Sequence, residues 1–214
     1  MKIDYIFVHH FGSTGNDPYA KTQNLTEAEI NQHHKSKYDF KSSLGFYIGY
    51  SAIIWPDGTL KWYRKIGEEL AANRGYNQRS IAICLAGNFT KLGNGYVEKP
   101  TDAQVRSLTA IALTLIMKQG AVWTLIPKVD KIEIDIPIIN IKPHRAVSLT
   151  SCYGSYLSDS WARDLVISAI QAKLSLLEKL LLLYQKMLEL LQRTKLGFRL
   201  GSESKSCWDS LEKN

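Results

Sequence analysis

Side chains that bind metal ions occur at three separate places in this sequence. The pair His9 and His10 ends an apolar run, His144 lies in a polar segment, and Cys152 follows it eight residues later. Two imidazoles and one thiolate suit zinc. Three protein ligands rather than four leave one coordination position for water, as in a catalytic zinc site and unlike a closed structural one.

The spacing alone leaves alternatives open. Successive side chains of a strand point to opposite faces, so only one of His9 and His10 can bind the metal, and the other is expected to pack or to form a hydrogen bond. The competing interpretation of the whole set is two hydrogen-bonded histidines and an inert thiol.

Three β-rich runs would position these side chains. Tyr5 to His9 is a short run that ends in polar residues, so it predicts a strand that delivers a histidine to a loop. Ser80 to Leu85 is continuously apolar, which suits a central strand buried on both faces, with Cys84 in the core. Ile132 to Ile141 predicts a further strand that leads into the loop of His144.

Two helices are predicted from capping boxes. Thr26 with Glu29 begins a short helix, and Thr101 with Gln104 begins a longer one that ends before Gly120. The apolar positions of the second helix recur at helical spacing, so one of its faces should cover a sheet.

A hairpin and a long C-terminal pattern complete the prediction of the fold. Residues 46–55 and 60–66 are β-rich and flank the turn sequence Pro56-Asp57-Gly58. The expected class is α/β, with a mixed central β-sheet flanked by helices and a C-terminal helical, coiled-coil-like extension.

The extension carries a heptad pattern with apolar residues in alternating steps of four and three: Ile170, Leu174, Leu177, Leu181, Tyr184, Leu188 and Leu191. Further leucines widen this stripe, which favours a helix for a bundle and a possible homo-oligomer through residues 170–191. Attachment to a membrane surface is the alternative. Four charged residues make the segment a poor membrane span: Glu178, Lys179, Lys186 and Glu189.

Composition narrows the classes of partner. The excess of 27 Lys and Arg over 20 Asp and Glu gives a net charge of +7, which favours polyanions. The basic residues are dispersed rather than clustered with aromatic residues, so no nucleic-acid binding is expected.

Three cysteines predict no disulfide framework. Asp4 and the histidine pair interrupt the first ten residues, so no signal peptide is expected.

Four motifs occur in an order typical of one superfamily: FVHH, GYSAIIWPDGTLKWYRK, NQRSIAICLAGNF and PHRAVSLTSC. Over residues 4–165 the chain resembles the zinc N-acetylmuramoyl-L-alanine amidases, which include phage endolysins and animal peptidoglycan recognition proteins. The resemblance implies hydrolysis of the amide bond between N-acetylmuramic acid and L-alanine in peptidoglycan. The expected organisation is a catalytic domain at 1–168, a heptad-patterned helix at 169–195 and a polar, flexible tail at 196–214.

The resemblance also implies the ligands of a single zinc ion, Zn2+. They are His9, the first histidine of FVHH, His144 of PHRAV, and Cys152. Because His9 is assigned as the ligand, His10 is left to the opposite face of the strand.

Four further residues are assigned by matching family positions. Tyr50 matches the catalytic tyrosine, and Thr150 stands two residues before the cysteine ligand, where the family has lysine or threonine, so both are expected to be catalytic. Arg64 and Asn77 match positions near the substrate groove and are expected to bind substrate.

The chain departs from the family pattern in two of its motifs. Ser51 and Ala52 replace the usual histidine and aromatic residue, and the segment around Leu70 lacks its usual histidine. Cys84 stands where some intracellular relatives have a glutamate that acts as general base. Elsewhere, the histidines at 33 and 34 lie on a polar helix and are interpreted as solvated.

The biological setting that these features favour is a phage or prophage endolysin. Such a protein would stay in the host cytoplasm until it is released to act on the cell wall. The alternative is a non-catalytic module that binds peptidoglycan, and the retention of Cys152 with both histidines argues against it.

Overall fold

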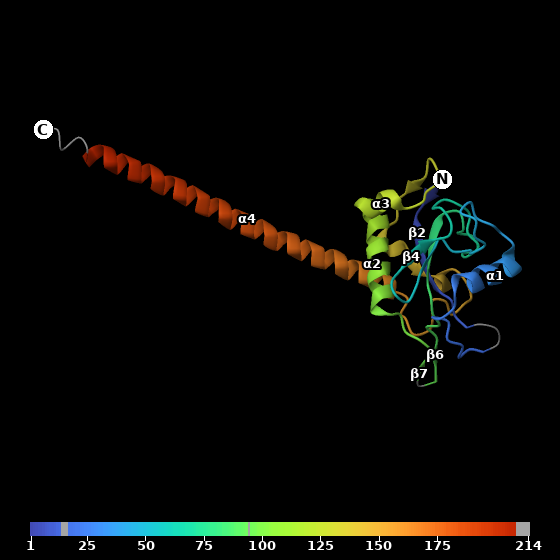
Figure 1. Ribbon diagram of the computed structural model, residues 1–214. Coiled ribbons are helices and arrows are strands. Elements are labelled where there is room, and N and C mark those ends of the chain that lie inside the picture. The colour runs from blue at the N-terminus through green and yellow to red at the C-terminus, as the bar shows by residue number, and fades with distance from the viewer. Residues whose placement is uncertain (14–16, 94, 209–214) are drawn as a thin grey trace. The chain divides into compact units, whose positions relative to one another are not determined.

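The computed structural model describes residues 1–13, 17–93 and 95–208, with side chains as far as residue 191 (Figure 1). The chain forms two compact units, Met1–Ile167 and Ser168–Asn214. The first unit contains every residue that the sequence analysis assigned to a site, so the fold of this unit positions the chemistry.

A mixed five-stranded sheet forms the centre of the first unit, as predicted. Its strands, in the order β4-β3-β5-β2-β9, are Leu60–Trp62, Ala52–Ile54, Ser80–Leu85, Tyr5–His10 and Ile141–Pro143. All neighbours in this sheet are parallel except β3 and β4, which form a hairpin across the Pro56-Asp57-Gly58 turn, as predicted. Both strands are shorter than the predicted runs 46–55 and 60–66. Every residue of β5 is buried, in agreement with the prediction of a central strand.

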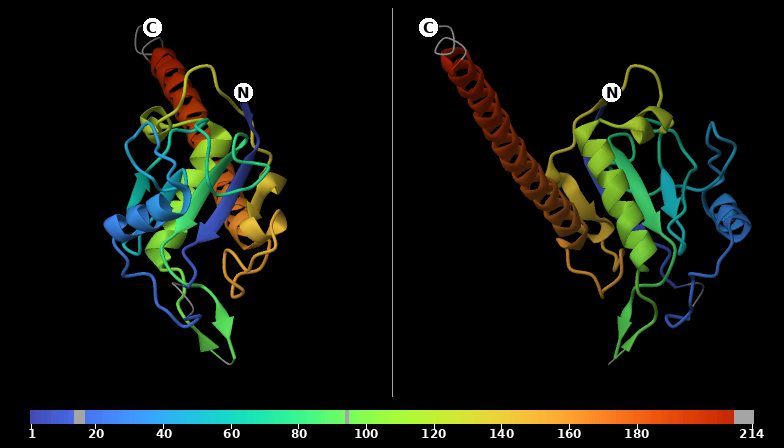
Figure 2. Two further views of the ribbon diagram at one scale, coloured as in Figure 1. Left: turned by 90° about the vertical axis from the view of Figure 1, so that its right-hand side faces the viewer. Right: turned by 60° about the vertical axis from the view of Figure 1, so that its left-hand side comes forward.

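Two helices cover opposite faces of this sheet (Figures 1 and 2). Helix α1 spans Glu27–Tyr38 and helix α2 spans Asp102–Met117, and both begin with the predicted capping boxes. The buried side-chain amide of Gln104 donates to the carbonyls of Ile54 and Ala86, at 3.0 and 2.9 Å, which ties the start of α2 to β3 and to the residue after β5.

The core on the side of α1 contains Cys84, whose side chain is fully buried beside Ile30 and Ile53. The prediction that Cys84 is a core residue is therefore confirmed. On the side of α2, the apolar face predicted from helical spacing is buried, with Leu108 and Leu115 at 1% and 0% exposure.

The segment 132–141 is not the continuous strand that the sequence analysis predicted. It forms β8, Glu133–Ile134, which pairs with β1, Lys2–Ile3, in a separate two-stranded sheet. A short 3-10 helix, Ile138–Asn140, then precedes β9. Pro137 explains the break, because it lacks a backbone N–H for the ladder and its fixed φ, here −61°, starts the 3-10 turn.

Two short features were not predicted. Helix α3 spans Ala121–Leu125, and strands β6, Lys91–Leu92, and β7, Gly95–Tyr96, form a small antiparallel pair. Neither segment is long enough to give a periodic pattern in the sequence.

Helix α4 spans Trp161–Trp208. Its first turns belong to the first unit, where Ala162 and Val166 are buried. Residues 196–208 are helical where the sequence analysis predicted a loosely ordered tail, and residues 209–214 lie outside the described part of the chain. The glycines at 197 and 201 each disfavour a helix by about 1 kcal/mol relative to alanine but, unlike proline, keep the backbone donor.

The second unit presents the predicted heptad stripe to solvent. Leu174, Leu177 and Leu181 are 54%, 52% and 59% exposed. Among the residues that the structure describes, no helix has both the length and the apolar character required to span a bilayer.

Candidate metal centre

The sheet brings His9 and His144 together at the carboxyl ends of two parallel strands. Val8 of β2 pairs with Pro143 of β9, so the residues that follow them, His9 and His144, lie side by side. Their ring centroids are 4.5 Å apart. In open α/β sheets this edge is the usual location of a binding site, because the loops that leave the strands there are free to vary.

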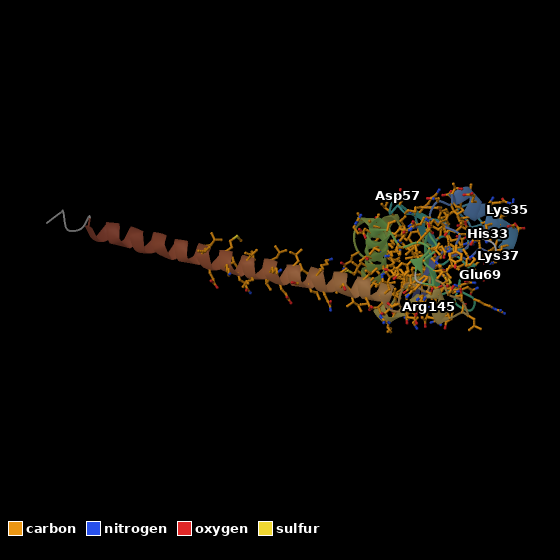
Figure 3. The ribbon with its side chains drawn as sticks, turned by 90° about the horizontal axis from the view of Figure 1, so that it is seen from below. His33, Lys35, Lys37, Asp57, Glu69 and Arg145 are labelled. Carbon is orange, nitrogen blue, oxygen red and sulfur yellow. The ribbon has the colours of Figure 1, made fainter. Side chains whose placement is uncertain are left out.

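Arg145 folds the loop of Cys152 back onto this edge. Its backbone N–H donates to the carbonyl of Cys152 at 2.8 Å. Its guanidinium, labelled in Figure 3, donates to the carbonyls of Gly154 and Leu157 and to the carboxylate of Asp159. The hydrogen bonds of Arg145 thus hold the loop 152–159 against the segment that carries His144.

Gly154 permits the close approach that this loop needs. It has a φ of +92°, and a Cβ atom there would lie 2.2 Å from the carbonyl oxygen of Phe89. The glycine therefore allows the loop to pack directly on the backbone that follows β5.

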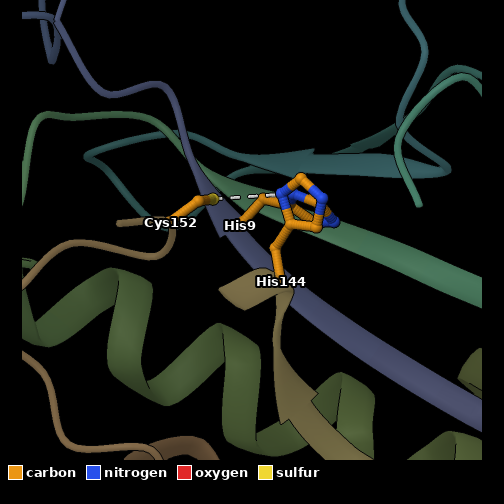
Figure 4. A group of neighbouring side chains, drawn as sticks. All are labelled: His9, His144 and Cys152. Atoms are coloured by element: carbon orange, nitrogen blue, oxygen red, sulfur yellow. Dashed lines mark hydrogen bonds between the residues drawn. The ribbon is translucent and has the colours of Figure 1, made fainter. Parts of the chain in front are cut away.

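The three side chains form one cluster (Figure 4). The ligand atoms of His9, His144 and Cys152 all lie within 4.8 Å of one another, and Sγ of Cys152 is 3.6 Å from Nδ1 of His9. Tetrahedral zinc with ordinary Zn–S and Zn–N bond lengths would separate such a sulfur and nitrogen by about 3.5 Å. The cluster could therefore hold one metal ion with small movements of its side chains.

Burial keeps these groups uncharged in the absence of a metal. It lowers the pKa of His9 well below the ordinary value, and repulsion from His144 lowers this pKa further. Burial also lowers the pKa of His144 and raises the pKa of the Cys152 thiol to about 12. Neutral imidazoles are ready to bind a cation, whereas the thiol must lose its proton to do so.

His10 lies on the opposite face of β2, as strand alternation requires. Its Nδ1 accepts the backbone N–H of Phe89 at 3.0 Å, and its own backbone N–H donates to Sγ of Cys152 at 3.4 Å. The His10 ring is therefore used in a buried hydrogen bond and does not belong to the cluster.

Tyr50 lies against the cluster. Its ring centroid is 5.1 Å from that of His9, and both residues line a pocket of about 320 Å3. Burial raises the pKa of the Tyr50 hydroxyl well above the ordinary value, and the electrostatic interaction with the buried Cys84 raises this pKa further. The hydroxyl is consequently a neutral donor.

Thr150 lines the same pocket and is exposed. Its Oγ1 accepts the backbone N–H of Cys152 at 3.2 Å, which leaves the hydroxyl proton available for another acceptor.

Arg64 does not reach a groove, contrary to the role assigned from the resemblance. It is 0% exposed, and its guanidinium donates to the carbonyls of Ile48 at 2.8 Å, Glu69 at 3.1 Å and Phe40. The planar fork of five N–H donors explains this position, because it satisfies several loop carbonyls at once.

Asn77 lines a groove of about 620 Å3 that also includes His144. Its Oδ1 accepts the backbone N–H groups of Ala72 at 3.2 Å and Asn73 at 2.6 Å. The structure thus shows a bracing role for this side chain, and a contact with substrate would have to come from its Nδ2.

Sequence reasoning missed His34. It was interpreted as solvated, but it is only 8% exposed, and its Nδ1 accepts the backbone N–H of Gly49 at 2.8 Å. Its ring centroid is 5.2 Å from that of Tyr50. His33, in contrast, is exposed, as are Lys35 and Lys37 of the same helix (Figure 3).

Asn73 was also missed. It is 0% exposed, and its Oδ1 is 2.9 Å from Nε2 of His9. The departures from the family pattern are buried as well: Oγ of Ser51 accepts the N–H of Ala82 at 3.1 Å, and Leu70 is 2% exposed.

The fold and the cluster define an α/β domain with room for one metal ion at the edge of its sheet, and known proteins share this architecture. Residues 1–154 match the N-acetylmuramoyl-L-alanine amidase family. The endolysin of Escherichia phage T7 is 36% identical over 123 residues, which cover 56% of this chain and 71% of that protein. The endolysin of Enterobacteria phage T3 is 36% identical over 105 residues, which cover 47% and 63%.

A solved structure agrees on the fold. The endolysin N-acetylmuramoyl-L-alanine amidase LysCS from Clostridium intestinale URNW superposes with a TM-score of 0.51 at 24% identity, over 81% of this chain and 84% of that chain. The chain therefore belongs to the N-acetylmuramoyl-L-alanine amidase family, which confirms the family predicted from its motifs.

Proposed function

We propose that this chain hydrolyses the amide bond between N-acetylmuramic acid and L-alanine in peptidoglycan, with one zinc ion held by His9, His144 and Cys152. The observation that supports this proposal best is the convergence of two imidazoles and one thiol at the sheet edge. His9 lies on β2, His144 directly follows the parallel strand β9, and Cys152 lies on a braced loop, all within the segment that matches the family.

Zinc, when bound, lowers the pKa of a coordinated water and polarises the scissile carbonyl. The protein would place hydrogen-bond donors around that carbonyl. The ring of Tyr50 packs against that of His9, and its neutral hydroxyl would suit the negative charge that develops on the carbonyl oxygen. Thr150 lines the same pocket, and its hydroxyl, which accepts the backbone N–H of Cys152, has a proton available.

The groove beside the cluster is the proposed substrate site. It has a volume of about 620 Å3, is lined by Asn77 and His144, and adjoins the pocket of the cluster through Tyr38, Ala71 and Ala72. The scissile amide would have to lie beside the cluster of His9, His144 and Cys152. The glycan and the peptide would therefore occupy opposite sides of this cluster. Asn77 is proposed to contact substrate through Nδ2, because its Oδ1 is already used.

The proposed biological role is that of a phage or prophage endolysin, released from the host cytoplasm to reach the wall. The two related proteins named above are both phage endolysins. The net charge of +7 favours association with an anionic wall. The exposed heptad stripe of α4 is proposed to join copies of the chain.

A direct test is digestion of purified peptidoglycan, with identification of the products by mass spectrometry. We expect wild-type protein to release stem peptides that begin with a free L-alanine, and His144→Gln to release none. His33→Gln is the matched control, since it removes an exposed histidine outside the cluster and should leave release unchanged.

The alternative function is a module that binds the wall without cutting it. Wild-type protein that sediments with peptidoglycan, with zinc present, but releases no peptide would establish the binding module and exclude the amidase.

A further inference from the structure

The orientation of the His9 ring determines which of its nitrogens can bind a metal. Nδ1 faces Sγ of Cys152 at 3.6 Å, whereas Nε2 faces away from the cluster toward Asn73. A neutral imidazole has one protonated nitrogen and one lone pair. For Nδ1 to be the ligand, Nε2 must carry the proton.

Asn73 supplies an acceptor for this proton. Its Oδ1 lies 2.9 Å from Nε2 of His9, and the whole residue is buried. The oxygen and nitrogen of an asparagine amide can exchange places by rotation of the side chain. Which of them faces His9 therefore depends on the partner of the other amide atom.

Ser80 holds the other end. The hydroxyl of Ser80 donates to the carbonyl of Tyr76 at 2.8 Å, which uses its only proton. The Ser80 oxygen must therefore accept from Asn73, and the distance to Nδ2 is 3.2 Å. Since Nδ2 is directed at Ser80, the amide oxygen is directed at His9.

Asn77 fixes the backbone from which Asn73 projects. Its Oδ1 accepts the N–H groups of both Ala72 and Asn73, at 3.2 and 2.6 Å. The hydrogen bonds thus form a directional chain, in which His9 donates to Asn73, Asn73 donates to Ser80, and Ser80 donates to the carbonyl of Tyr76.

We propose that Asn73 is a positioning residue for the metal: it holds His9 as the tautomer protonated at Nε2 and directs the Nδ1 lone pair toward Cys152 and His144. This inference rests on the proposed zinc site. Partners of this kind orient a metal-binding histidine and raise its basicity, and their loss typically weakens metal binding about 10- to 100-fold.

The test compares variants by competition with a chelator for zinc. Asn73→Leu keeps the branching of the side chain at Cγ but removes the acceptor, and we expect its zinc affinity to fall about 10- to 100-fold. Asn73→Asp keeps an acceptor oxygen and should restore the affinity. The absorption spectrum of the Co(II)-substituted protein should change in the leucine variant and return in the aspartate variant, because it reports ligand geometry.

Asn88→Leu is the matched control. Asn88 is also 0% exposed, and its amide donates to the carbonyls of Pro18 and Ala20, away from His9. We expect this substitution to lower the melting temperature without changing zinc affinity. Equal loss of zinc affinity in the two leucine variants would assign Asn73 a merely structural role and overturn the inference.

A measurement on the wild-type protein makes the test independent of how the variants fold. The 15N shifts of the His9 ring in zinc-free protein at neutral pH should show the proton on Nε2. A proton on Nδ1 would contradict the inference.

The proposed zinc site and the proposed role of Asn73 can be disproved separately. If wild-type protein and Cys152→Ser have the same zinc affinity, the proposed metal site is wrong. If Cys152→Ser loses zinc but Asn73→Leu retains wild-type affinity, the metal site stands and the role of Asn73 is wrong.

Discussion

At the scale of single residues, the site depends on groups that burial keeps neutral. The Tyr50 hydroxyl remains protonated because burial and the electrostatic interaction with Cys84 raise its pKa well above the ordinary value. A neutral hydroxyl can donate to a developing oxyanion, whereas a phenolate could not.

Removing this donor should slow turnover without removing the metal. We predict that Tyr50→Phe lowers kcat about 10²- to 10³-fold, the usual cost of losing one such donor. Zinc content per chain, measured by atomic absorption, should stay at the wild-type value. Tyr47→Phe is the control, because Tyr47 is a partly buried tyrosine that contacts Lys35 and Lys41. Equal kcat for Tyr50→Phe and wild type would rule out the proposed role.

The three residues proposed to hold the metal were easier to predict from the sequence than the residues that surround them. His9, His144 and Cys152 are residue types with few structural uses together, and their motifs matched a family. Asn73 and His34 have no comparable signal, since asparagine in a polar segment and histidine on a polar helix usually face solvent. Arg64 was misassigned because its burial depends on three carbonyls from different segments, and the local sequence does not show that these segments meet.

At the scale of elements, α1 and the loops around it form the wall that supports Tyr50. His34 connects α1 to Gly49, the residue before Tyr50, through a buried hydrogen bond. Burial lowers the pKa of His34 to about 4. The helix is therefore joined to the site through a side chain that must remain neutral.

This connection predicts a pH dependence of stability. Below pH 6.5 the unfolded chain binds a proton at His34 before the folded chain does, so the free energy of unfolding falls as the pH decreases toward 4. Lowering this pKa from 6.5 to about 4 corresponds to about 3 kcal/mol. Urea unfolding at pH 7 and pH 4.5 should show a smaller fall for His34→Gln than for wild type. An equal fall in both would contradict the assignment.

Arg64 should act on stability rather than on substrate binding. We predict that Arg64→Met lowers the free energy of unfolding by about 2–4 kcal/mol, because three carbonyls lose their donor. Arg106→Met removes an exposed arginine of α2 and should change it by less than about 0.5 kcal/mol. Denaturant melts measure both. A stable Arg64→Met protein with a raised KM would instead restore the substrate-binding role.

The elements themselves were largely predictable where periodicity and capping agreed. The capping boxes of α1 and α2 and the apolar run of β5 are local signals, and the structure contains all three. The run at 132–141 misled because its composition is β-rich, whereas Pro137 and pairing with β1 determine where strands form. Pairing between distant segments cannot be read from local composition.

At the scale of the whole molecule, an amidase domain is followed by a helix with an exposed apolar stripe. Leucines that are more than half exposed are costly to leave in water, and the 3.5-residue spacing is that of helices that pack on one another. The boundary between the two units, after Ile167, lies next to the predicted end of the catalytic domain at 168.

Association through this stripe is directly measurable. We predict that the full chain has a molar mass in solution that is a multiple of 24.2 kDa, and that Leu177→Lys with Leu181→Lys gives 24.2 kDa. The control carries the same charge on the polar side, as Ser175→Lys with Gln185→Lys. Light scattering after size exclusion provides the mass. A wild-type monomer that binds anionic vesicles would replace oligomerisation with membrane attachment.

The most direct test of the central claim is a zinc titration of metal-free protein, with release of L-alanine-terminated peptide from peptidoglycan measured at each step. We predict that release rises linearly and stops rising at one zinc per chain, and that Cys152→Ser gives no release at the same zinc concentrations. Full release from metal-free protein, or from Cys152→Ser at one equivalent of zinc, would contradict the assignment of His9, His144 and Cys152 as the catalytic metal site.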